Sequence, residues 1–212
     1  MSGAEPRLSP TDLLVAKARD DLHGEFDAVH SPETVNRLYD ESLALFSGAE
    51  VPDYVPTLAQ RMARDRLRAL GQVAGSIAHE RPEVVFVGLE GRGRSQMAAA
   101  LAELRSEGRV HAVAVATRAT VALDPNVVAA MAEVGLDLSD AYARPLSDEV
   151  LSAADVVVTM GRSVGVVDVP ETIRREDWRV GDPVDASLDE VRRIRRELES
   201  RVDELLERLG TG

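Results

Sequence analysis

The chain has 212 residues, of which 44% are hydrophobic, and carries a formal net charge of −12. This charge disfavours a nucleic-acid-binding surface or binding to an anionic membrane. The sequence contains no cysteine, which excludes disulfides, thiolate metal sites and an internal thiol relay. The four histidines show no ligand spacing, so we predict no metal or cofactor. Because the chain has neither a signal-like leader nor an apolar stretch of membrane-spanning length, we expect a cytoplasmic protein.

Residues 1–80 are predicted to form a bundle of three helices. Ser9-Pro10-Thr11-Asp12 is typical of a capped helix start, and Ser31-Pro32-Glu33 opens a second helix in the same way. A third helix, ending near Gly75 to His79, carries the apolar residues Leu58, Met62, Leu70, Val73 and Ile77. Short amphipathic helices joined by short links favour a small bundle.

The second helix also suggests self-association. Leu38, Tyr39, Leu45 and Phe46 spread over an arc that we expect to be too wide for two neighbouring helices to bury. We therefore predict that the N-terminal helices mediate a homodimer.

Residues 81–212 alternate between strand and helix patterns. The apolar runs at 84–87, 110–115 and 155–160 are typical of buried strands. Asp124-Pro125 and Ser187-Leu188-Asp189-Glu190 are predicted to cap helices. Continuous apolar strands separated by helices indicate an α/β domain with a parallel sheet that helices cover on both faces.

The loop after the first of these strands carries the clearest chemical pattern. Gly88, Gly91 and Gly93 let the backbone turn tightly and direct successive N–H groups inward, and a helix then starts near Ser95. Arg94 can place two N–H groups on two oxygens of a tetrahedral anion. The spacing alone also fits a dinucleotide site or a purely structural turn. We expect an oxyanion to bind to residues of this loop, namely Leu89, Glu90, Gly91, Arg92, Gly93, Arg94 and Ser95.

The stretch Gly88-Leu89-Glu90-Gly91-Arg92-Gly93-Arg94-Ser95-Gln96-Met97-Ala98 resembles the phosphate-binding loop of low-molecular-weight protein tyrosine phosphatases and the related arsenate reductases. Further similarity lies in residues 131–139, 145–150, 154–161, 176–178 and 182–183, and is greater to the arsenate reductase branch. The resemblance implies a four-stranded parallel sheet flanked by helices over residues 81–212. Similar three-helix extensions precede some actinobacterial arsenate reductases.

The resemblance also assigns roles to individual positions. The family's nucleophilic cysteine stands six residues before the loop arginine, and that position here is Gly88. The family's general acid corresponds to Asp182, and the serine that supports the thiolate corresponds to Ser95. Asp182 could instead simply start a turn before Pro183. Glu90 could pair with Arg92 or Arg94, or indicate a loop that no longer binds anions.

Three functions follow from these patterns. We favour a catalytically degenerate binding or regulatory protein that holds phosphate, arsenate or a phosphorylated ligand without cysteine chemistry. The first alternative is an arsenate transferase that uses an external small thiol such as mycothiol. The second is a scaffold or oligomerisation module in which the loop is vestigial. Attack by water with help from Asp182 is the remaining route to catalysis.

Overall fold

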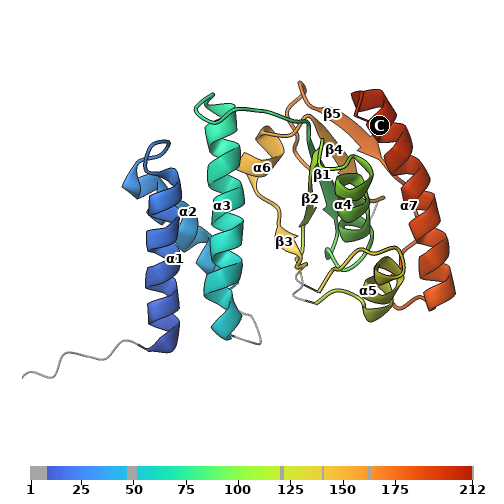
Figure 1. Cartoon of the computed structure of the whole chain (residues 1–212), viewed down its shortest axis with the longest axis horizontal. Helices are drawn as coiled ribbons and strands as arrows, with labels where there is room; N and C mark the ends of the chain where they lie inside the picture. The colour runs from blue at the N-terminus through green and yellow to red at the C-terminus, as the bar shows by residue number, and fades with distance from the viewer. Residues whose placement is uncertain (1–8, 47–51, 120–121, 140, 162–163, 212) are drawn as a thin grey trace, which may run out of the picture. The chain divides into compact units, whose positions relative to one another are not determined.

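The computed structural model describes residues 9–46, 52–119, 122–139, 141–161 and 164–211. The chain divides into two compact units, Met1–Ala78 and His79–Gly212, which are coloured blue to cyan and green to red in Figure 1. Each unit has its own buried side chains, so each is described by itself.

The described part of the first unit is helical. Its elements are α1 (Pro10–Phe26), α2 (Pro32–Leu45), the 3-10 helix η1 (Pro52–Tyr54) and α3 (Val55–Val73). Ser9 and Asp12 form the expected capping box at the start of α1. Leu22 of α1, Leu38 of α2 and Leu67 of α3 are completely buried, and the three α-helices pack against one another.

The structure corrects the burial expected for the second helix. Leu38, Tyr39 and Phe46 are buried, and only Leu45 is exposed, at 54%. Of the four residues, the expected exposure therefore holds only for Leu45. Arg66 of α3 is also buried and forms an ion pair with Glu41 of α2, with 2.6 Å between Nη2 and Oε2.

The second unit contains a parallel sheet with the strand order β3-β2-β1-β4-β5. The strands are β1 (Glu83–Gly88), β2 (His111–Ala116), β3 (Arg144–Pro145), β4 (Val156–Thr159) and β5 (Arg174–Asp177). In the central strand, Val84 pairs with Ala112 on one side and with Val156 on the other. Val84, Val85, Phe86 and Val87 are all buried, as expected for a strand covered on both faces.

The α/β fold with a parallel sheet and flanking helices is confirmed, but the sheet has five strands instead of four. Both edge strands lack an apolar run: β3 has only two residues, and β5 consists of Arg174-Arg175-Glu176-Asp177. Short or charged edge strands are usual because they limit pairing with other chains. Their composition is also the reason that the sequence pattern did not reveal both of them.

Helices cover the sheet. The elements are α4 (Arg94–Arg105), α5 (Pro125–Ala132), α6 (Asp148–Ser152) and α7 (Leu188–Leu209). In Figure 1, α4 and α7 lie on one face of the sheet and α6 lies on the other.

Asp124 caps α5 and Ser187 caps α7, as predicted. Within the described ranges, no helix is both long and apolar enough to cross a bilayer.

Candidate oxyanion site

The 88–95 loop connects the end of β1 to the start of α4, at the carboxyl edge of the parallel sheet. Its turn depends on glycine at two positions. Gly91 has a φ of +69°, and a Cβ there would lie 2.7 Å from the Cβ of Ala143. A Cβ on Gly93 would lie 2.4 Å from Cγ of Pro183. A side chain at either position would therefore collide with a neighbouring segment.

Backbone N–H groups of this loop have no partner inside the described part of the chain. The donors without an acceptor there are the amides of Leu89, Gly91, Arg92, Gly93, Arg94 and Ser95. The last two are the first residues of α4, whose N-terminal dipole adds partial positive charge. A cluster of unsatisfied backbone donors at a helix start is suited to bind an anion.

Arg94 places its guanidinium beside the loop. Its Nη1 donates to the Val180 carbonyl at 3.2 Å, and its Nη2 donates to Oδ2 of Asp182 at 3.0 Å. These bonds use two of the five guanidinium N–H groups, so the others are available to a ligand. Arg94 and Asp182 lie 88 residues apart in the sequence, yet they contact each other at this site.

The Asp182-Pro183 segment is fixed by a buried carboxylate that our sequence reasoning did not find. Asp124 accepts hydrogen bonds from the backbone N–H groups of Asn126 at 2.9 Å and Asp185 at 3.1 Å. The backbone N–H of Asp124 donates to the Arg92 carbonyl at 3.0 Å. Asp124 thereby connects the glycine-rich loop, the start of α5 and the Asp182 segment. Its helix cap was visible in the sequence, but its long-range partners were not.

The floor of the site is formed by Gly88 and Ser95. A Cβ added to Gly88 would lie 2.8 Å from Oγ of Ser95 and 3.6 Å from the backbone nitrogen of Gly91. Ser95 is only 1% exposed, and its hydroxyl has no hydrogen-bond partner within the described residues. The hydroxyl therefore lies close to the space that a side chain at position 88 would occupy.

The acidic residue of the loop, Glu90, forms an ion pair with an arginine from outside the loop. Glu90 accepts from Nη2 of Arg118 at 2.9 Å, and Arg118 lies just after β2. This pairing offsets part of the negative charge that Glu90 brings to the loop. The Arg92 side chain is half-buried and has no ion pair with any described residue. Arg162, which also follows a strand, lies outside the described residues.

These residues enclose a small cavity of about 50 Å³. Residues 88–95 and Asp182 line it. A cavity needs roughly 10–15 Å³ of such volume to admit one water, so this one has room for more than one oxygen-sized group. Its size and its backbone donors suit a small tetrahedral anion better than a large ligand.

Sequence comparison places this geometry in a known family. Residues 83–212 match the family described as low molecular weight phosphotyrosine protein phosphatase. The chain belongs to this family. Residues 15–71 match the family described as protein-tyrosine-phosphatase-like, N-terminal domain.

The relatives within the low molecular weight phosphatase family include arsenate reductases. A putative arsenate reductase of Halobacterium salinarum is 38% identical over 127 residues, which are 58% of this chain and 89% of the relative. A glutaredoxin arsenate reductase of Synechocystis is 31% identical over 131 residues, covering 60% of this chain and 98% of the relative.

Solved structures agree with the sequence relatives. A Corynebacterium glutamicum thioredoxin-dependent arsenate reductase superposes with a TM-score of 0.83 at 29% identity, over 93% of this chain and 97% of that one. An arsenate reductase in the phosphate binding state covers 60% of this chain and 98% of its own, with a TM-score of 0.55 at 29% identity. The predicted resemblance to this superfamily, and to its actinobacterial arsenate reductases, is confirmed.

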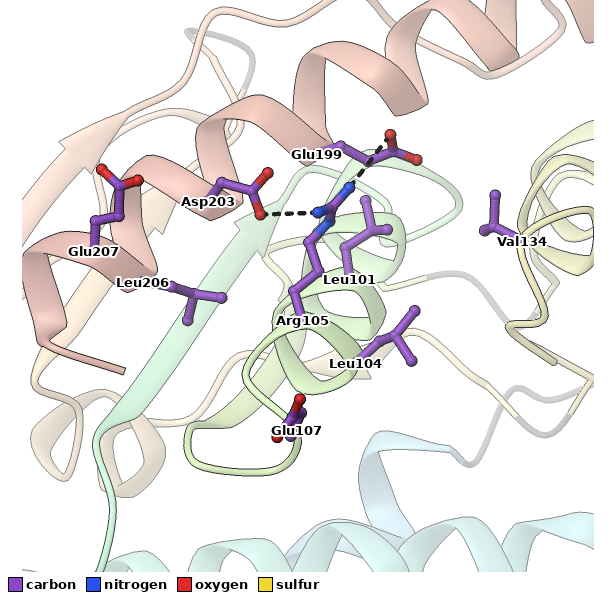
Figure 2. A pocket seen from close by; sticks show the side chains of 9 residues that line it. All are labelled: Leu101, Leu104, Arg105, Glu107, Val134, Glu199, Asp203, Leu206 and Glu207. Carbon is purple, nitrogen blue, oxygen red and sulfur yellow. Dashed lines mark ion pairs between the residues drawn. The ribbon is translucent and has the colours of Figure 1, made fainter. Parts of the chain in front are cut away.

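A second, larger hollow of about 750 Å³ lies between α4 and α7 (Figure 2). Its floor includes Leu101 and Leu206, and Arg105 crosses it to contact Asp203 at 3.1 Å and Glu199 at 3.6 Å. These charged groups satisfy one another. No cluster of three or more potential metal ligands occurs in the part of the chain that is described. The 88–95 loop is therefore the better candidate for a ligand site in this phosphatase-family chain.

Proposed function

We propose that this chain binds a small tetrahedral oxyanion, phosphate or arsenate, in the 88–95 loop and does so without the family's cysteine chemistry. The observation that carries the proposal is the set of backbone N–H groups that have no acceptor among the described residues and surround a cavity of about 50 Å³, with Arg94 beside it. Hydrogen bonds to a charged acceptor are about twice as strong as neutral ones. A solved relative described as being in the phosphate binding state supports the ligand class.

The residues of the floor argue against nucleophilic catalysis. Position 88 is glycine, so the loop has no thiol, and the chain has no cysteine elsewhere. Ser95 is a poor replacement because a serine hydroxyl needs an adjacent base, and its Oγ contacts no hydrogen-bond acceptor in the described chain. A binding or regulatory role therefore suits this site better than turnover.

Calorimetry on the purified full-length protein tests the proposal. We expect phosphate, arsenate and vanadate to bind the wild type, and Arg94→Ala to weaken binding by about tenfold or more, because a charge-assisted contact is lost. Arg105→Ala is the matched control: it removes a guanidinium in the last turn of α4, at the opposite end of that helix from the loop, where it pairs with Asp203 and Glu199. If none of the three anions binds the wild type, or if Arg94→Ala binds them unchanged, the proposal is wrong.

Enzyme assays separate binding from catalysis. We expect no hydrolysis of para-nitrophenyl phosphate and no arsenate reduction with thioredoxin, glutaredoxin or mycothiol as the thiol source. Turnover by the wild type that Asp182→Asn abolishes would instead favour attack by water or by an external thiol with Asp182 as the acid.

For the helical unit we propose self-association as a separate property. Its support is the group of exposed apolar side chains in that unit, which are Leu13, Leu14, Leu45, Tyr54 and Val73. Light scattering at several concentrations tests it. A concentration-dependent dimer that Leu45→Ser weakens and Arg94→Ala leaves intact would support the proposal, and a monomer at all concentrations would refute it.

A further inference from the structure

The Ser95 hydroxyl is one of a few buried polar groups of the second unit that have no partner among the described residues, and among these it is the one that lines the small cavity. It is buried almost completely, yet neither its proton nor its oxygen has a partner within the described residues. Buried hydroxyls are normally hydrogen-bonded, because leaving one unpaired destabilises the folded state. A buried hydroxyl that lacks a partner and lines a ligand pocket is therefore suited to form its hydrogen bond with the ligand.

The position of the hydroxyl shows where that partner would lie. Oγ of Ser95 is 2.8 Å from the point at which a Cβ on Gly88 would sit, and Ser95 and Gly88 both line the cavity. The same point is 3.6 Å from the backbone nitrogen of Gly91. The space above Gly88 is thus bordered by a hydroxyl and by a backbone donor that itself has no acceptor among the described residues.

We infer that the Ser95 hydroxyl is a direct ligand of the bound oxyanion and donates a hydrogen bond to an oxygen that points toward Gly88. This inference rests on the proposed function, since it assigns a further contact of the same pocket. Because no thiolate stands at position 88, the Ser95 hydroxyl has no such acceptor within the loop and is left for an oxygen of the anion.

The contact has a consequence for the class of ligand. A thiolate at position 88 would repel an anionic oxygen from the floor, whereas a hydroxyl attracts it. The floor therefore takes an unsubstituted oxygen, and an inorganic anion can place oxygens both on the floor and toward Asp182. Inorganic phosphate, arsenate and a phosphate monoester all carry such an oxygen, so the contact favours tetrahedral oxyanions as a class.

Ser95→Ala tests the inference through two measurements, the melting temperature without anion and the affinity for phosphate, and only the affinity should fall. Without anion, we expect an unchanged or higher melting temperature, because the substitution removes a buried, unpaired hydroxyl. In calorimetry with inorganic phosphate, we expect the affinity to fall about tenfold or more, because a hydrogen bond to a charged ligand is lost. A purely structural role for Ser95 would not produce this pair of effects.

Ser147→Ala is the matched control. Its Oγ is also buried without a partner in the described chain, but Ser147 does not line the cavity. We expect this variant to change the melting temperature in the same direction while binding phosphate like the wild type. A similar loss of phosphate affinity in Ser147→Ala would overturn the inference.

Gly88→Ala provides an independent test by displacing the hydroxyl. The added methyl would lie 2.8 Å from Oγ of Ser95, so the hydroxyl must rotate away from the floor. We expect Gly88→Ala to weaken phosphate binding in the wild type but to have a smaller effect when Ser95 is already alanine. If Ser95→Ala binds phosphate like the wild type while Arg94→Ala does not, the inference fails and the proposed function stands. If the wild type does not bind phosphate, both fail.

Discussion

The Arg94 guanidinium and the Asp182 carboxylate form an ion pair beside the candidate oxyanion pocket, with 3.0 Å between Nη2 and Oδ2. The Arg94 side chain is 13% exposed, whereas that of Asp182 is 58% exposed. The cation is therefore held in place, and its partner can turn toward solvent at little cost. An incoming anion competes with Asp182 for the same guanidinium, so the ion pair opposes binding until it opens.

Asp182→Asn should therefore strengthen phosphate binding. The substitution removes the competing charge, and because the carboxylate is exposed we expect only about a two- to fivefold gain in affinity. The gain should shrink at high ionic strength, since salt screens exposed charges. Calorimetry at low and high salt measures both effects, with the exposed Asp168→Asn as a control of equal charge change. Weaker binding by Asp182→Asn would contradict this prediction and would mean that the carboxylate contributes to binding, as the acceptor of a hydrogen bond from a hydroxyl group of the anion.

The Glu90–Arg118 pair gives a second electrostatic prediction. Glu90→Gln should raise phosphate affinity, because it removes a negative charge from a residue that lines the pocket. Arg118→Ala should lower the affinity, because Glu90 loses a cation 2.9 Å from its carboxylate. Both changes should be smaller than tenfold, since the Arg118 side chain is largely exposed.

A double-mutant cycle isolates the contribution of this pair. If Arg118 acts only by offsetting Glu90, Arg118→Ala should have almost no effect when Glu90 is already glutamine. An undiminished effect in that background would mean that Arg118 contacts the anion directly.

The features predicted correctly from the sequence depend on local interactions. The central strand was recognisable because its residues 84–87 form a continuous apolar run, and Ser9, Asp124 and Ser187 cap helices that begin one residue later. The glycine-rich loop could be located for the same reason, since its turn and its helix start are encoded within a few residues.

The features that were missed depend on residues far apart in the sequence. The Asp124 carboxylate contacts the backbone of Asp185, 61 residues away, and Arg118 contacts Glu90 at a separation of 28. Neither contact leaves a periodic pattern in the sequence. Strand β5 was missed for another reason: its four charged residues resemble an exposed loop, and only the hydrogen bonds with β4 make it a strand.

Acid should weaken the contact between α5 and α7. Hydrogen bonds from Arg192, with a further contribution from Arg195, hold the pKa of Glu133 below its ordinary value of 4.5. The stabilisation from a lowered carboxylate pKa is fully present above the unfolded pKa and is lost as the pH falls through the folded one. Arg192→Ala should therefore flatten the dependence of stability on pH below about 4.5.

Urea unfolding between pH 3 and 7, followed by the fluorescence of the single tryptophan, measures this dependence. Trp178 is buried and packs on Phe86 with 5.5 Å between ring centroids, so its emission reports on the second unit. Below about pH 4.5, the free energy of unfolding should fall less steeply with pH in Arg192→Ala than in the wild type. At higher pH, the two proteins should show the same slope. Equal slopes below about pH 4.5 in both proteins would show that Glu133 does not contribute to the pH dependence of stability.

Gly88→Cys should create a phosphatase from this chain. The thiolate would attack the phosphorus of an aryl phosphate, the phenolate would leave with a proton from Asp182, and water would then hydrolyse the phosphocysteine. Ser95 must rotate first, because a Cβ at position 88 would lie 2.8 Å from its Oγ. The rotated hydroxyl can then donate to the thiolate, and the loop amides and Arg94 remain in place to bind the phosphoryl oxygens.

We expect Gly88→Cys to hydrolyse para-nitrophenyl phosphate above the level of Gly88→Ser, which has the same backbone substitution without a thiol. Adding Asp182→Asn should lower the rate by about a hundredfold or more, the usual contribution of a positioned acid. Adding Arg94→Ala should abolish turnover. If Gly88→Cys binds vanadate but shows no hydrolysis, the loop lacks the alignment needed for attack, and a cysteine at position 88 is not sufficient for phosphatase activity in this chain.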